Sequence, residues 1–161
     1  LPTTGGGDVE AGLAIAGLIA GMRKPTVSLG LGGGHSIGVP LAVAAKRSFI
    51  APSAAVTIHP VRMSGTIIAS PQTYAYFQKI QERIVGFITA HSHVSAKEFT
   101  RMMMETQELS ADTGTIVSGD EAVSCGLIDQ VGSLADALDA LHEMIDARRP
   151  LCPVCGVRHG G

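Results

Sequence analysis

The spacing of apolar residues along this chain of 161 residues changes repeatedly between the period of a helix and that of a strand. Apart from Glu10, apolar and small residues fill positions 9–22, after Asp8, which can cap a helix, and before Lys24 and Pro25, which end it. Residues 25–45 carry no formal charge and contain a run of glycines near their middle. The pattern predicts a helix over about 9–22, a buried strand over 26–31, a glycine turn and a second helix to about 45.

The rest of the chain continues this alternation of strands and helices. Ser70 followed by proline is typical of a helix start, and Ser133 with an acidic residue three positions later is typical of a capping box. The spacing predicts strands over 48–51, 54–58, 115–117 and 127–131, and helices over 71–90, 95–106, 120–125 and 134 to about 148. This order indicates an α/β layered fold in one domain over 1–149, followed by a tail over 150–161.

The longest predicted helix has one apolar face. Its apolar side chains recur at three and four residues, at Tyr74, Phe77, Ile80, Ile84, Phe87 and Ile88. That face can belong to the core of the monomer or to a contact between subunits. In a domain this small we expect part of it to stay exposed for assembly.

Composition limits the classes of partner. Hydrophobic residues make up 45% and charged residues 16% of the chain, which favours a packed core, and the aromatic share of 4% means that aliphatic side chains must fill it. A net charge of −2 offers no basic surface for nucleic acid. We expect no membrane span, because glycines, a histidine and a serine interrupt the uncharged stretch. Three cysteines without a visible signal peptide favour a cytoplasmic location.

The glycine-rich run over 32–38 contains the motif Gly-x-Ser-x-Gly around Ser36. Glycines on both sides let the backbone turn tightly between a strand and a helix, and they let a substrate approach the serine oxygen. Amide groups at the start of the following helix can stabilise an oxyanion. Ser36 is therefore a candidate nucleophile.

A serine hydroxyl needs a neighbouring base to attack a substrate at neutral pH. His59 is the best candidate, because it ends an apolar, β-rich run and Pro60 fixes the turn after it. The alternative is a histidine at a strand end that is hydrogen-bonded to backbone.

The acid that would orient such a base is less well marked. No carboxylate lies between the serine and the histidine, so the acid comes from Asp8 or Glu10 upstream or from further downstream. Asp112, just before a predicted strand, is our choice, and Glu108, one helical turn earlier, is its competitor. Either downstream residue can also simply cap a helix.

Three strings in a fixed order carry a resemblance to a known family: GGDVEAGLAIAGLI, KPTVSLGLGGGHSIGVPLAVAAKRSFIAPSAAVTIHP and EAVSCGLIDQVG. Over about residues 4–145 the chain resembles the proteolytic subunit of the Clp protease, and within that family its translocation-enhancing branch. The resemblance implies a layered ClpP/crotonase-like fold of repeated strand–helix units, with the long helix as a handle between two stacked rings. It also implies a serine-type endopeptidase that cuts peptides or unfolded proteins inside an oligomeric ring, without a cofactor or metal.

The family pattern assigns roles to particular residues. Its nucleophile falls on Ser36, its base on His59, and its oxyanion donors on the N–H groups of Gly7 and Ile37. Its acid falls near Asp112, but the chain is about two residues longer in that interval, which leaves the choice of acid open. The chain starts without Met, and we expect the family's upstream segment, which helps to dock an AAA+ unfoldase, to be missing. Partnership with such an ATPase stays open.

The chain also departs from the family at several positions. His35 stands where the family usually has a small alanine. Adjacent side chains at a helix start point about 100° apart, so we do not expect His35 to be the base. It either lines the substrate pocket or fills space. Cys152, Cys155 and His159 have the spacing of half a zinc site, but without a fourth ligand we expect an unstructured or disulfide-forming tail. Cys125 is expected to be a small core residue.

Three other functions stay open at this point. A crotonase-like enzyme acting on acyl-CoA thioesters shares the fold and the glycine-built oxyanion hole. A catalytically silent ring subunit is compatible with the unsettled acid. A small esterase of the α/β-hydrolase type would use Ser36, Asp112 and His142, although the chain is short for that fold and the pattern buries His142 in the last helix.

Overall fold

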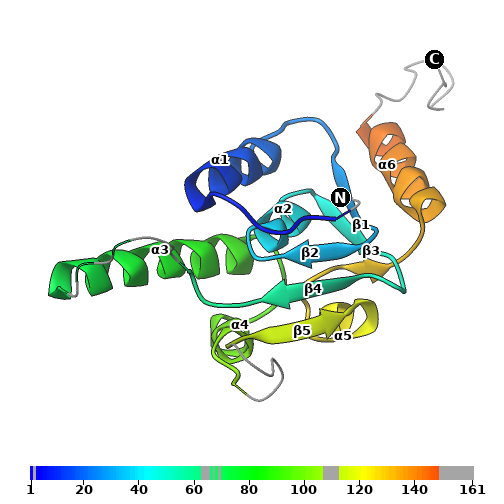
Figure 1. The fold of residues 1–161 in the computed structure, drawn as a ribbon. Helices are drawn as coiled ribbons and strands as arrows, with labels where there is room; N and C mark the ends of the chain where they lie inside the picture. The colour runs from blue at the N-terminus through cyan, green and yellow to red at the C-terminus, as the bar shows by residue number, and fades with distance from the viewer. Residues whose placement is uncertain (2, 63–65, 67, 69, 107–112, 149–161) are drawn as a thin grey trace, which may run out of the picture.

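The computed structural model describes residues 1, 3–62, 66, 68, 70–106 and 113–148, and these residues form two three-stranded sheets (Figure 1). One sheet is parallel throughout and contains, in spatial order, β1 (Val27–Gly30), β3 (Arg47–Ile50) and β6 (Gln130–Val131). The other contains β2 (Gly33–His35), β4 (Ala55–Ile58) and β5 (Thr115–Ser118), with β2 parallel and β5 antiparallel to β4. Mostly parallel strands joined through helices confirm the α/β fold that the sequence predicts.

Helices connect these strands and cover the sheets. Those in the described part of the chain are α1 (Val9–Ala20), α2 (Gly38–Val43), α3 (Pro71–Ala90), α4 (Ala96–Met103), α5 (Gly119–Ser124) and α6 (Leu134–Arg148). Asp8 caps α1 by accepting a hydrogen bond of 2.8 Å, and Ser70 caps α3, as the sequence predicts. Before α6, hydrogen bonds from Ser133 hold the pKa of Asp136 below its ordinary value. None of the described helices is long and apolar enough to cross a bilayer.

Two elements differ from the sequence prediction because of their backbone partners. The glycine run does not form only a turn, because Gly33–His35 pairs with β4 as a short parallel strand. The last strand is shorter than the predicted 127–131. The N–H groups of Leu127 and Ile128 instead donate to the carbonyl of Ala122 in α5, at 2.9 and 3.0 Å, so they cannot take part in a sheet.

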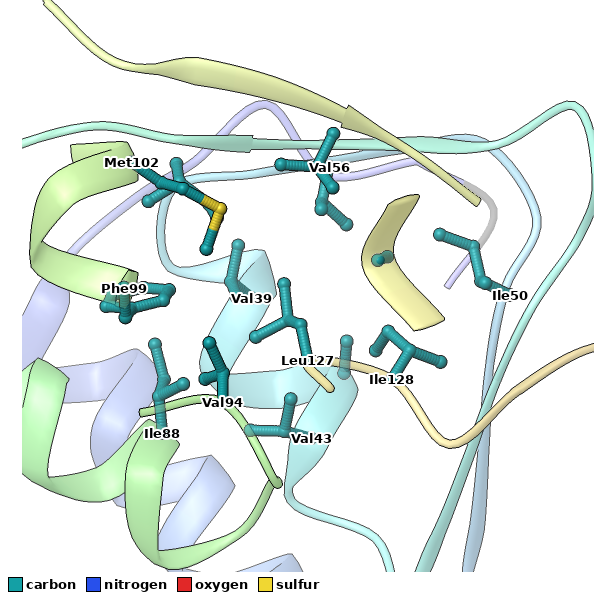
Figure 2. Packing of buried hydrophobic residues seen from close by; sticks show 14 of the residues in the cluster. Val39, Val43, Ile50, Val56, Ile88, Val94, Phe99, Met102, Leu127 and Ile128 are labelled. Atoms are coloured by element: carbon teal, nitrogen blue, oxygen red, sulfur yellow. The ribbon is translucent and has the colours of Figure 1, made fainter. Parts of the chain in front are cut away.

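The main core gathers around α2, which packs against strands of both sheets and against α1 and α3. Figure 2 shows Val39 and Val43 of α2 facing Ile88 of α3, Phe99 of α4 and the loop residue Leu127. A smaller cluster lies on the far side of the first sheet, where Phe49 of β3 packs against Ala137 and Ala140 of α6. Burial of these apolar side chains provides the main favourable term in folding.

The predicted apolar face of α3 is divided between the core and solvent. Ile80, at the middle of the helix, and Ile88, near its C-terminal end, are buried. In the N-terminal half, which projects from the body of the molecule in Figure 1, the exposed fractions are 67% for Tyr74 and 53% for Tyr76. Part of the helix surface is thus exposed, as expected, while its use in assembly stays a prediction.

The motif Gly-Leu-Ile-Asp has a structural role at the centre of the first sheet. The carboxylate of Asp129 accepts hydrogen bonds from the N–H and the hydroxyl of Ser48 on β3, at 2.8 and 2.9 Å. The Asp129 N–H in turn donates to the Ser48 hydroxyl at 3.0 Å. These bonds satisfy a buried serine and fix the chain between α5 and β6 against β3.

Candidate active site

Ser36 occupies the sharp turn between β2 and α2. Its φ angle is +57°, in the left-handed region that residues other than glycine enter only rarely. Its N–H donates to the carbonyl of Thr57 on β4 at 3.0 Å, and its carbonyl accepts from the N–H of Val39 at 3.0 Å. The Ser36 hydroxyl has no hydrogen-bond partner within the described residues. Backbone bonds therefore hold the turn, and the hydroxyl stays available for other contacts.

Ser36 lines a cavity of about 260 Å³ together with His59, Gly7 and Ile37. These residues come from the β2–α2 turn, the end of β4 and the loop before α1. The parallel pairing of β2 with β4, which sets His35 opposite Thr57, brings the serine and the histidine to the same end of one sheet. The candidate nucleophile, the candidate base and both candidate oxyanion donors thus share one cavity.

The orientation of His59 follows from a contact with backbone. Its Nδ1 lies 2.7 Å from the carbonyl oxygen of Pro60. A carbonyl oxygen can only accept a hydrogen bond, so Nδ1 carries the hydrogen and Nε2 of the neutral ring has a free lone pair. In the described residues no hydrogen bond joins His59 to Ser36. The backbone contact expected for a strand-end histidine is present, and it leaves Nε2 in the form that a general base needs.

The loop that contains Gly7 is anchored at both ends. Before it, Thr4 pairs with β2, donating to the carbonyl of Gly33 at 2.7 Å and accepting from the N–H of His35 at 3.0 Å. After it, Asp8 caps α1. Within it, Gly6 has φ +100° and comes so close to Ser36 that a Cβ on Gly6 would lie 3.3 Å from the Ser36 Cβ. The backbone can approach the serine this closely because Gly6 has no side chain.

Ile37, the residue after the serine, is buried under the first turns of α1. A Cβ added to Gly12 of α1 would lie 2.1 Å from Cγ1 of Ile37, which is far inside van der Waals contact. Gly12 therefore lets α1 pack directly over the residue whose N–H is a candidate oxyanion donor.

His35 does not line this cavity. Its Nδ1 lies 2.6 Å from Oγ1 of Thr57 on the neighbouring strand, and its ring covers Gly33, where a Cβ would come within 2.4 Å of Nε2. Of the two roles expected for it, the structure shows the space-filling one: the ring occupies the place that a side chain at Gly33 would take.

The structure describes two of the four carboxylates that the sequence offered as the acid beside His59. Asp8 caps α1, and Glu10 binds Arg83 of α3 through both oxygens, so neither upstream acid orients the histidine. Asp112 and Glu108 lie outside the described residues, as do Cys152, Cys155 and His159. The described residues contain no group of three potential metal ligands among His, Cys, Asp and Glu.

One further histidine is not placed as the sequence suggested. His142 is exposed rather than buried, because Ala137 and Ala140 are the α6 residues that face the first sheet. It does not line the cavity with Ser36, so the structure does not assemble the esterase arrangement. Cys125 is partly buried and packs against the main core, as expected, and this burial raises the pKa of its thiol.

The apolar side of the cavity was not identified from the sequence. Ile84 and Ile88 of α3 and Phe99 and Met103 of α4 form this wall. Their helical spacing predicts burial but cannot show which buried residues border a cavity, because that depends on how α3 and α4 cross the serine turn.

Comparison with known proteins gives the family of this chain. The sequence model of the Clp protease family matches residues 3–134. The chain is 55% identical over 150 residues to the translocation-enhancing protein TepA of Halalkalibacterium halodurans, and the match covers 93% of this chain and 59% of that protein. The chain thus spans somewhat less than two thirds of that relative's length. These matches confirm the resemblance carried by the three sequence motifs, and the chain belongs to the Clp protease family.

Proposed function

We propose that the chain is a serine-type endopeptidase of the Clp type. The observation that carries the proposal is the single cavity in which Ser36, at a left-handed turn, meets His59 and the loop and turn that supply the Gly7 and Ile37 amides. Acyl transfer requires a serine at such a turn, a histidine whose Nε2 carries no hydrogen, and two backbone donors.

In the proposed mechanism, Oγ of Ser36 attacks the peptide carbonyl while its proton passes to Nε2 of His59. The oxyanion of the tetrahedral intermediate accepts hydrogen bonds from the N–H groups of Gly7 and Ile37, each worth about 3 kcal/mol in the barrier. His59 then gives the proton to the leaving amine, which leaves an acyl-enzyme. Water then attacks the acyl-enzyme with His59 again as the base, which releases the acyl group as a carboxylic acid and regenerates the Ser36 hydroxyl. The hydrogen bond from serine to histidine is often loose before substrate binds.

The apolar wall of the cavity favours substrates with an apolar side chain before the cleaved bond. Ile84, Ile88, Phe99 and Met103 offer no charge to a polar side chain entering there. Extended segments of peptides or unfolded proteins are the substrates that can present such a side chain to Ser36 while their backbone lies across the oxyanion donors.

Alanine variants of two buried phenylalanines test this assignment of the wall. Phe99 and Phe49 are 2% and 1% exposed, but only Phe99 borders the cavity with Ser36. Each change to alanine is expected to lower the free energy of unfolding by about 3–5 kcal/mol, measured in urea. Only Phe99→Ala, which enlarges the cavity, should raise kcat/KM for larger apolar residues before the cleaved bond relative to smaller ones. An equal shift in Phe49→Ala, the matched control, would contradict the assignment.

Assembly into a ring is part of the proposal. Exposed apolar side chains on two helices support it: Tyr74 and Tyr76 on the projecting half of α3, and Ile15 and Leu18 on α1. If the active sites are enclosed in such a ring, an AAA+ unfoldase is the partner that folded substrates would need in order to reach them. The relative is named as a translocation-enhancing protein, and we extend a role in translocation to this chain as part of the proposal. A cytoplasmic location fits these partners.

One observation favours a catalytically silent ring subunit as the second candidate. Nδ1 of His59 bonds to the Pro60 carbonyl, and no hydrogen bond connects His59 with Ser36 in the described part of the chain. If substrate does not bring the two side chains together, the cavity would bind peptide without cleaving it.

Covalent labelling of the wild-type protein separates these candidates. A fluorophosphonate reacts with an activated serine, and mass mapping of the digested adduct is expected to find it on Ser36 alone. A protein that stays unlabelled while it joins a ring with an active homologue would be a silent subunit. Saturable binding of an acyl-CoA thioester without serine reactivity would instead indicate crotonase-like chemistry.

A further inference from the structure

Arg83 and Glu10 join α3 to the first turn of α1 by two parallel hydrogen bonds. Nη1 of Arg83 lies 2.5 Å from Oε1 of Glu10, and Nη2 lies 2.9 Å from Oε2. The guanidinium and the carboxylate thus meet as two planar forks, a geometry that fixes orientation as well as distance. Figure 1 shows the N-terminal end of α1 above the part of α3 that joins the body of the molecule.

Both ends of this contact lie next to the candidate active site. Glu10 follows Gly7 by three residues, and Val9 between them lines the cavity. Arg83 precedes Ile84, which forms part of the apolar wall. The pair therefore connects the loop that supplies one oxyanion donor with the helix that forms the opposite wall.

The pair is too exposed to contribute much to global stability. The side chains of Arg83 and Glu10 are 52% and 57% exposed, and ion pairs at such positions stabilise proteins weakly. Their hydrogen bonds nevertheless lower the pKa of Glu10 and raise that of Arg83. Both groups are therefore charged near neutral pH, and the main effect of the contact is to fix the relative position of two helices.

The first turn of α1 needs such a contact because the surrounding packing holds it on one side only. Gly12 and Ala16 are the buried residues of α1, and Gly12 rests on Ile37. Ile15 and Leu18, which lie off this buried face, are exposed. Without the link to α3, the start of α1 can pivot about the Gly12 contact and carry the Gly7 loop with it.

We propose that Glu10 and Arg83 are a positioning pair that holds the Gly7 amide at the correct distance from Ser36. The inference rests on the proposed peptidase function. The pair touches neither substrate nor the reacting atoms, and it acts through the backbone of residues 7–10.

The test compares Glu10→Gln, Arg83→Gln and the exchanged pair Glu10→Arg with Arg83→Glu. Each single variant is expected to react about tenfold more slowly with a fluorophosphonate, less than the loss on removing a donor outright. Its kcat should fall while KM stays near the wild-type value, and its Tm should change by no more than about 2 °C. The exchanged pair restores an ion pair between the two helices and should recover most of the labelling rate.

Glu98→Gln is the matched control. It removes an exposed contact of the same fork geometry, from Arg101 to Glu98 at 3.1 and 2.8 Å, within α4. Labelling of this variant should proceed at the wild-type rate. The proposal would be overturned if single variants of Glu10 or Arg83 were labelled as fast as wild type. It would also be overturned if they were labelled more slowly and the exchanged pair did not recover the labelling rate.

Amide hydrogen exchange over residues 5–12 separates this inference from the proposed function. If no fluorophosphonate labels the wild-type protein, the peptidase function is contradicted, but amide hydrogen exchange can still test the positioning role. Faster exchange in the single variants, reversed in the exchanged pair, would support the positioning role. Unchanged exchange would overturn it.

Discussion

Replacing Ser36 by alanine is expected to lower kcat for peptide hydrolysis about a millionfold, the loss seen when a catalytic serine is removed from a nucleophile–base pair. Labelling by a fluorophosphonate should disappear at the same time, because among the described residues Ser36 is the one serine that lines the cavity with His59. The fold should be unaffected. The Ser36 hydroxyl has no partner among the described residues, and alanine can keep the same backbone bonds to Thr57 and Val39.

Urea unfolding and the native mass of the assembly provide the check on folding. Ser124→Ala is the matched control, because the Ser124 hydroxyl bonds within its own helix to the carbonyl of Asp120 and lies away from the cavity. This control should be labelled and should hydrolyse peptide like the wild type. Labelling that persists in Ser36→Ala would show that another residue is the nucleophile.

Replacing Asp112 by asparagine is expected to lower kcat by up to about 10⁴-fold, the cost of losing the acid that stabilises the charged form of a catalytic histidine. Glu108→Gln is the matched control and should stay within about twofold of wild type, the scatter expected for a substitution that removes no reacting group. The measurement is the rate of peptide hydrolysis at saturating substrate, with the labelling rate beside it.

The reverse result, a large loss in Glu108→Gln and none in Asp112→Asn, would exchange the two roles. Unchanged activity in both variants would leave the Pro60 carbonyl as the group that orients His59. The structure makes this a specific outcome, because Nδ1 already donates to that carbonyl at 2.7 Å. A carbonyl can fix the position of the ring hydrogen, but it carries no full charge to stabilise the imidazolium.

Helix starts were predictable from the sequence because capping is local. Asp8, Ser70 and Ser133 each bond to groups within three residues, so the signal lies within a short window. The Gly-x-Ser-x-Gly motif is also short, although the left-handed φ of its turn falls on Ser36 and not on a glycine of the motif. The order of motifs was sufficient to predict the family.

Strand limits and the walls of the cavity were harder to predict because their partners are distant in sequence. The glycine run becomes β2 only because β4, more than 20 residues later, accepts and donates its backbone bonds. The strand expected over 127–131 is shortened because α5 takes two of its N–H groups. The helix that contains Phe99 and Met103 was predicted from the sequence, but not that these residues border a cavity.

The sequence by itself determined the α/β class, the helix starts, the serine turn and His59 as its candidate partner. The tertiary structure decided that the serine and histidine share a cavity, that His35 faces elsewhere, and that Glu10 binds Arg83 across 73 positions. The physical reason is the range of the interactions. Caps and tight turns are set by bonds between near neighbours, whereas a cavity and a link between helices exist only after distant segments have packed together.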